Sequence, residues 1–195
     1  MDAHAQTLPA ANVPAVPTNK LAMWLFLASE VMFFTGLIGT YIVLRFGSPS
    51  WPSPGQFLVI PLGAVNTFIP ICSSMTMVLA FQAADQGNVG ALRRYLFLTV
   101  LLGSAFLGIK GYEYSRKFAH GYYPSTGLYW SCYFTLTGFH GLHVLGGVIT
   151  NLVLWIQAMR RRLPPEKSYV VELAGLYWHF VDIVWIFLFP IVYLL

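Results

Sequence analysis

Five long apolar stretches constrain this chain more than any other feature of its sequence. Each is long enough to cross about 30 Å of hydrocarbon as a helix, which takes about 20 residues. A backbone in lipid must satisfy its own hydrogen bonds, and the alternating pattern of barrel strands is absent. The sequence therefore predicts an all-α membrane protein, a bundle of five transmembrane helices that cover roughly residues 21–45, 57–83, 93–115, 127–158 and 169–195.

The composition also favours a membrane protein over a soluble one. Apolar residues make up 57% of the chain and charged residues only 9%, whereas a soluble domain carries about 25% charged residues. The net charge of +4 is modest, and the basic residues gather between the apolar stretches. This arrangement is typical of membrane proteins and gives no reason to expect a nucleic-acid partner.

The ends of the chain and its orientation follow from charge and composition. Residues 1–19 are rich in Ala and Pro and lack the basic start of a cleavable signal peptide. We expect a disordered cytoplasmic tail there, followed by a single domain at 20–195. With the N-terminus inside and the C-terminus outside, seven basic residues face the cytoplasm and three face outward, as the positive-inside rule favours. The seven are Lys20, Arg93, Arg94, Arg160, Arg161, Arg162 and Lys167; the three are Arg45, Arg116 and Lys117.

Ionisable side chains inside the apolar stretches are the candidates for function, because a charge at the bilayer centre costs about 3 kcal/mol on insertion scales. Counting helical rise from the nearest inner basic residue places carboxylates and histidines of different helices in matching layers. This favours an inward-facing polar network, related to protons or lipid headgroups. Its predicted members are Glu30, Glu113, His140, His143, His179 and Asp182.

Glu30 has only apolar residues, Phe33 and Phe34, at the helical positions that face it. Because burial disfavours a carboxylate, the sequence predicts a protonated Glu30 whose polar partner belongs to another helix. The layer at a depth of about 15–18 Å also holds His179, which is the favoured partner. Two interpretations stay open: a proton or lipid-headgroup site, and a neutral acid that orders the bundle.

The histidines could suggest a metal or a haem. His140 and His143 share one helix face, but zinc takes four ligands, and no Cys or carboxylate stands at a recognisable spacing beside them. A haem would need histidines on two facing helices, which His140 or His143 could provide together with His179. Hydrogen bonds between helices are the simpler interpretation. We therefore expect no metal ligand, cofactor-binding residue or catalytic residue in this chain.

Four motifs resemble subunit III of the haem–copper oxidases and occur in the order typical of that family. They are Leu27–Phe34, Lys110–Tyr114, Thr137–Val144 and Tyr177–Trp185. The resemblance covers the chain from about residue 20 to its end. It implies the five-helix bacterial form of the subunit, which occurs in both cytochrome c and quinol oxidases, as a multi-pass protein of the bacterial inner membrane.

The resemblance also implies a role. The subunit would carry no redox centre, because haem and copper lie in partner subunits. It would pack on subunit I, away from subunit II, in a proton-pumping respiratory oxidase that reduces oxygen to water, and a respiratory supercomplex is a further level of assembly. It would hold phospholipid in a V-shaped cleft and support proton uptake. The family glutamate that reacts with carbodiimide corresponds to Glu30.

One departure from the family concerns the number of helices. The mitochondrial form has seven, and the first two form one wall of the cleft, so a partner chain would supply that wall here. Two other functions stay open beside the leading one: a haem-binding electron-transfer subunit, and a proton or ion transporter.

Overall fold

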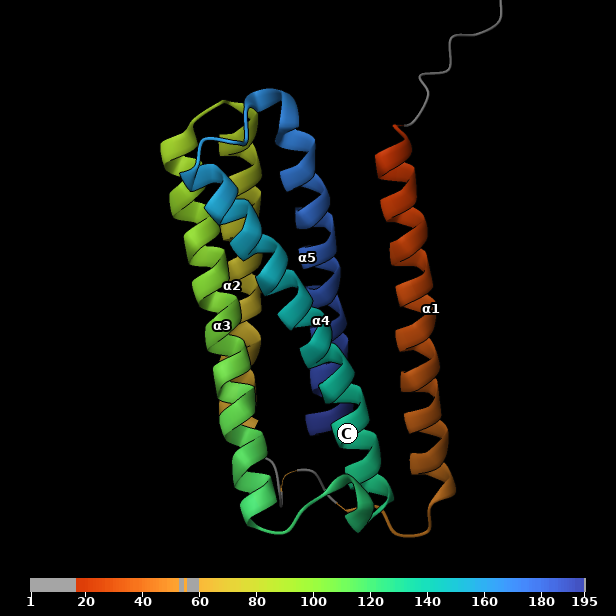
Figure 1. Ribbon diagram of the computed structural model, residues 1–195. Helices are drawn as coiled ribbons and strands as arrows, with labels where there is room; N and C mark the ends of the chain where they lie inside the picture. The colour runs from red at the N-terminus through yellow and green to blue at the C-terminus, as the bar shows by residue number, and fades with distance from the viewer. Residues whose placement is uncertain (1–16, 53–54, 56–59, 195) are drawn as a thin grey trace, which may run out of the picture.

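The computed structural model describes residues 17–52, 55 and 60–194, and within these ranges the chain forms five long α-helices and no strand (Figure 1). All five are long and apolar enough to cross a membrane. The predicted five-helix membrane architecture is therefore confirmed. The helices are α1 (Thr18–Gly47), α2 (Ile60–Asp85), α3 (Val89–Ala119), α4 (Leu128–Met159) and α5 (Ser168–Phe189), which continues as the π-helix η4 (Pro190–Leu194).

The start of α1 differs slightly from the predicted tail. Residues 1–16 of that tail lie outside the described residues, as do residues 57–59 of the second predicted span. The helix begins at Thr18, inside the range assigned to the tail, because Pro17 offers its carbonyl to the backbone N–H groups of Lys20 and Leu21. A proline before the first turn suits a helix start, where its missing N–H is not needed.

Helices α2 to α5 pack together, and α1 stands at one edge of them (Figure 1). In the most apolar window of α1 only 11% of the residues are buried, against 28–44% in the other four spans. Most side chains of α1 therefore face the surroundings of the chain, so that a few contacts must hold this helix in place.

Close backbone approach around Trp178 joins α3, α4 and α5. A Cβ atom on Gly147 would lie 2.6 Å from the Trp178 ring, and one on Gly103 would lie 2.7 Å from Trp178 and from Val148. Glycine at these two positions lets the helices meet on the indole, whose Nε1–H donates to the Ser73 hydroxyl of α2 at 3.0 Å.

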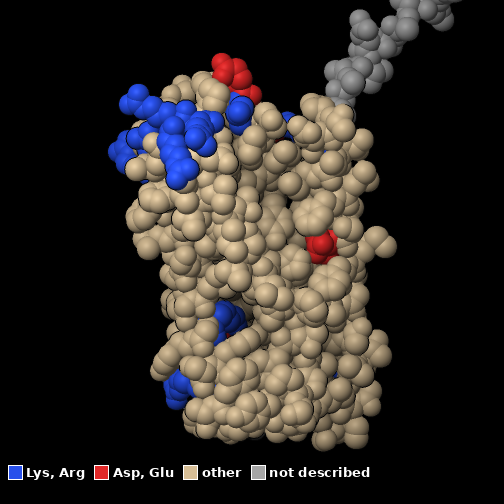
Figure 2. Space-filling view, viewed as in Figure 1, with Lys and Arg blue, Asp and Glu red and all other residues tan. Residues whose placement is uncertain are grey.

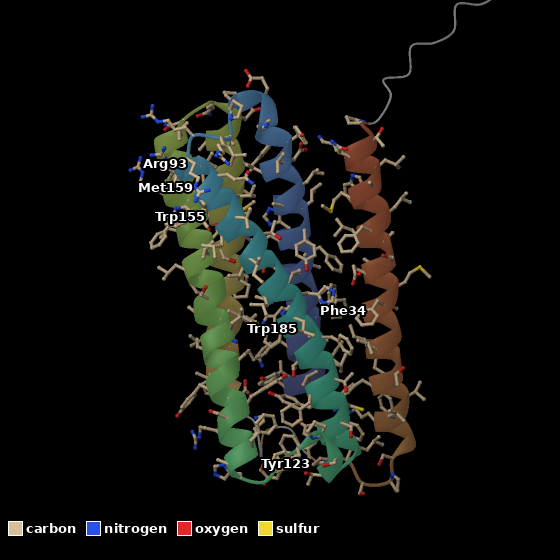
Figure 3. All side chains as sticks on the ribbon, viewed as in Figure 1. Phe34, Arg93, Tyr123, Trp155, Met159 and Trp185 are labelled. Atoms are coloured by element: carbon tan, nitrogen blue, oxygen red, sulfur yellow. The ribbon has the colours of Figure 1, made fainter. Side chains whose placement is uncertain are left out.

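Basic side chains gather at the end of the bundle where α1 begins, as Figure 2 shows for one face. Arg93, labelled there in Figure 3, donates from Nε to the Ala158 carbonyl at 3.0 Å and so ties α3 to the end of α4. At the same end, the Lys20 ammonium of α1 lies 2.6 Å from the Glu172 carboxylate of α5. The side of the membrane on which this end lies stays a prediction.

Candidate functional site

Glu30 of α1 meets His143 of α4 near the middle of the bundle. Glu30 Oε2 lies 2.9 Å from His143 Nε2, and each side chain is 19% exposed. The prediction that His179 is the partner of Glu30 was wrong. The depth count gives the height of a residue along the membrane but not the direction in which its side chain points. Tyr177 of α5 lines the space beside α1. His179 stands two residues later, a rotation of about 200° around the helix, and its side chain therefore points toward α2.

The geometry of His143 fixes the proton count of this pair. Nδ1 lies 2.8 Å from the backbone carbonyl of Phe139, which can only accept, so Nδ1 carries a hydrogen. One further proton is needed between Nε2 and Oε2. The pair is therefore either a neutral acid donating to a neutral imidazole, or an imidazolium donating to a carboxylate. Both forms are neutral overall, which suits a site inside the membrane.

Aromatic rings enclose the pair from the α1 side. The His143 ring lies 5.1 Å from the Phe34 ring in an edge-on arrangement and 6.3 Å from that of Phe33. Figure 3 labels Phe34 on the side of α1 that faces α4 and α5. From α5, the Tyr177 hydroxyl donates to the His143 carbonyl at 3.0 Å. Three helices thus converge on one carboxyl–imidazole pair.

Two hollows follow α1 on either side of this pair. The larger, of about 400 Å³, lies between α1, α4 and α5 and is lined mainly by apolar side chains, among them Met23, Phe26 and Leu173. The smaller, of about 200 Å³, lies between α1 and α4, where Leu37 and Tyr41 face Cys132. Contacts and apolar space therefore alternate along α1. The contacts are Lys20–Glu172, Glu30–His143 and Tyr41–Trp51.

His179 and Asp182 form a second group with Ser74 of α2. The Ser74 hydroxyl lies 2.7 Å from His179 Nδ1 and 2.7 Å from Asp182 Oδ2. A hydroxyl has one proton to donate and lone pairs to accept, so it relays a hydrogen bond between the two residues. His179 and Asp182 stand three residues apart on α5, so both side chains reach the Ser74 hydroxyl and hold α5 against α2.

Glu113 forms a third group, with charged and phenolic partners. Its carboxylate accepts from Lys110 at 3.1 Å, from Lys117 at 3.2 Å, and from the hydroxyls of Tyr133 at 3.1 Å and Tyr193 at 2.8 Å. All five side chains are buried. The group joins α3, α4 and η4, so its evident task is to fix the C-terminal turn against the bundle.

His140 stands apart from these groups. It is 1% exposed, stacks on the Trp185 indole at 5.0 Å and meets the Phe106 ring edge-on at 5.7 Å. Neither ring nitrogen has a hydrogen-bond partner among the described residues. The six predicted site residues therefore form separate groups instead of one network. Within the described ranges, no three His, Cys, Asp or Glu side chains gather as metal ligands would.

Comparison with known proteins identifies the family. The sequence model described as "Cytochrome c oxidase subunit III" matches residues 5–195. The chain belongs to this family. It is therefore a subunit III of a haem–copper oxidase, a multi-pass membrane protein that forms part of an oxidase complex with other subunits.

Individual relatives agree with this assignment. The chain is 37% identical to "Probable cytochrome c oxidase subunit 3" of Nocardia farcinica, over 96% of this chain and 92% of the relative. It is 35% identical to "Cytochrome c oxidase subunit 3" of Bacillus sp. PS3, over 98% and 94% of the two chains. It is also 38% identical to "Cytochrome bo(3) ubiquinol oxidase subunit 3" of Pseudomonas aeruginosa, over 88% and 82%. The resemblance to subunit III is thus confirmed, with relatives named for both electron donors.

Several residues of these subunit III groups escaped the sequence analysis. Lys117 stands four residues after Glu113, a helical spacing that could have revealed the ion pair. Tyr133 stands seven residues before His140 and so shares its helix face, which was a weaker signal. Ser74 and Tyr193 gave no signal in the sequence. A serine in an apolar stretch is common, and the position of Tyr193 depends on the π-helix that follows α5.

Proposed function

We propose that this subunit packs on subunit I, with subunit II in the same complex, binds phospholipid beside α1 and supports proton uptake by subunit I without performing redox chemistry. The observation that carries the proposal is the placement of the Glu30–His143 pair between two apolar hollows along α1. Acyl chains suit the hollows, and the pair offers a site that exchanges or shares one proton at mid-membrane depth.

The surface of α1 supports a partner or lipid layer outside it. Met32 is 76% exposed, Val43 70% and Phe46 82%. Apolar side chains of this kind are as well accommodated by lipid as by protein, so the surface alone does not choose between them. Family membership supplies the protein partner, because a subunit III belongs to a larger oxidase.

The surroundings of the histidines support the proposal that haem and copper lie in other subunits. His140 is enclosed by Trp185 and Phe106, and a porphyrin bound to it would have to displace both rings. His179 Nδ1 is engaged with Ser74, and His143 Nε2 with Glu30. Hydrogen bonds between helices account for the last two histidines without an iron ligand.

For the orientation, we propose that the end where α1 begins is cytoplasmic and that the membrane is the bacterial inner membrane. Most basic residues lie at that end (Figure 2), which the positive-inside rule places in the cytoplasm. The relatives named above come from bacteria.

Lipid retention tests the proposal through a variant that fills the larger hollow. Thr150 lines it and is exposed, and among the described residues its hydroxyl bonds only to the Gly146 carbonyl of its own helix. Thr150→Phe should therefore fill the hollow with little effect on packing. The neighbouring Ile149, which is 52% exposed and outside the lining, provides the matched control Ile149→Phe.

The measurements are phospholipid per purified oxidase and the loss of activity during turnover. We expect Thr150→Phe to retain less phospholipid and to inactivate faster than the control, in an intact complex with a normal initial rate. Equal phospholipid content and equal inactivation in the two variants would contradict lipid binding in this hollow.

A further inference from the structure

A third, much smaller cavity lies between α2, α3, α4 and α5. Its volume is about 10 Å³, which is about the room that one water molecule needs. The lining combines apolar side chains, among them Phe106 and Trp178, with three polar residues: Ser73, His140 and Asp182. Each polar residue comes from a different helix, so a ligand in this cavity would be shared between α2, α4 and α5.

His140 supplies the reason to expect a ligand there. Its side chain is 1% exposed, and among the described residues neither Nδ1 nor Nε2 has a hydrogen-bond partner. A buried polar group without a partner is costly, so such groups are normally satisfied by protein or by ordered water. The Phe106 ring that touches the imidazole has no conventional donor or acceptor. The Trp185 indole stacks on the imidazole, and its Nε1–H donates to the Thr67 hydroxyl instead, at 3.1 Å.

The other polar groups can complete the coordination. Asp182 is 6% exposed, and its Oδ2 takes the Ser74 hydroxyl, which leaves acceptor capacity on the carboxyl group. The Ser73 hydroxyl donates to the Pro70 carbonyl and accepts from Trp178, and one lone pair remains. Together with His140 these groups give two or three partners, as a buried water requires.

We propose that this cavity binds one ordered water molecule, held between His140 and the carboxyl group of Asp182. A metal ion fits less well, because zinc takes four ligands and calcium six to eight oxygens, whereas the cavity offers one imidazole, one carboxyl and one hydroxyl. The water joins His140 to the chain of hydrogen bonds that runs from Asp182 through Ser74 to His179. One polar path then links α4, α5 and α2 through the core of the subunit.

This inference concerns the interior of the subunit and is independent of lipid binding along α1. It is tested by a density map of the intact oxidase in lipid nanodiscs, at a resolution at which other buried waters are visible. We expect a peak within hydrogen-bond distance of a His140 ring nitrogen and of an Asp182 oxygen. An empty cavity in that map would overturn the proposal.

A variant pair tests the role of His140. His140→Leu introduces an apolar side chain of similar size and removes both nitrogens, while Leu102→Met changes the lining without removing a polar group. The peak should disappear in the first variant and persist in the second. A peak that persists unchanged in His140→Leu would exclude His140 as a ligand. If that variant does not assemble, His140→Gln, which keeps polar atoms at the position, should assemble and retain the peak, and loss of the peak there would also count against the proposal.

Discussion

Replacing Glu30 distinguishes the two proton arrangements of its pair with His143. In the neutral form, Glu30 donates to His143 Nε2, and the amide of Glu30→Gln can donate in the same way. A neutral hydrogen bond contributes about 0.5–1.5 kcal/mol, so this variant should lose less than about 1 kcal/mol. Glu30→Leu leaves Nε2 without a donor, which costs about 1–3 kcal/mol. Because each side chain is 19% exposed, we expect the lower half of that range, about 1–2 kcal/mol. This loss corresponds to a factor of about 5–30 in the equilibrium between attached and detached α1.

If the pair is ionic, the two variants should rank differently in stability. Removing one charge of a buried pair costs about 3–5 kcal/mol, so Glu30→Gln would be as disruptive as Glu30→Leu. The assay is subunit retention on the oxidase during detergent titration. Glu172→Gln is the matched control, since Glu172 is a partly exposed carboxylate paired with Lys20.

Infrared difference spectroscopy then shows directly whether the Glu30 carboxyl group is protonated. We expect the parent oxidase to show the carbonyl band of a protonated carboxyl group, and Glu30→Gln to lose it, while Glu172→Gln keeps it. A protonated Glu30 should also react with carbodiimide. A parent spectrum without this band, together with equal disruption by Gln and Leu at position 30, would refute the neutral pair.

The effect of Glu30→Gln on oxidase activity can be measured separately from its effect on stability. If Glu30 orders helices and lipid, Glu30→Gln should leave oxygen turnover nearly unchanged and alter lipid retention or inactivation. Immediate loss of proton pumping in an intact complex would instead identify Glu30 as a direct proton carrier.

Two further predictions follow from the packing and a third from the topology. Gly147→Val should lower thermal stability, at a cost of about 1–3 kcal/mol from overpacking against Trp178, whereas Gly36→Ala, which meets nothing within 4 Å, should not; equal melting temperatures would refute this. Tyr193→Phe removes one buried donor to Glu113 and should cost about 1–3 kcal/mol, seen as earlier protease cleavage at the C-terminus than in wild type. Reporter fusions should place the two termini on opposite sides of the membrane, the N-terminus inside, and both ends on one side would contradict the topology.

The five helices were predictable because length and apolarity alone decide whether a segment crosses a bilayer. The turn between α2 and α3 contains Gly87, whose φ of 68° favours glycine. The family followed from four ordered motifs. These features are local in sequence and need no knowledge of how the helices face one another.

The partners of the polar residues were not predictable in the same way. The apolar neighbours of Glu30 on its own helix correctly indicated a partner on another helix. The depth count favoured His179, but the rotation of α4 and α5 decides that His143 reaches Glu30 instead. The hydroxyl of Ser74 captures His179 instead. Such choices depend on side-chain packing between helices, which a single sequence specifies only through the folded bundle.

Purification of the tagged subunit from its native membrane tests the proposed function most directly. Mass spectrometry of the co-purifying chains and the visible spectrum would be recorded on the complex and again on the subunit after its release. We expect subunits I and II and a haem spectrum in the complex, and no haem band in the released subunit. A subunit that always purifies alone, or that keeps a haem band after release, would contradict a structural, lipid-binding subunit III.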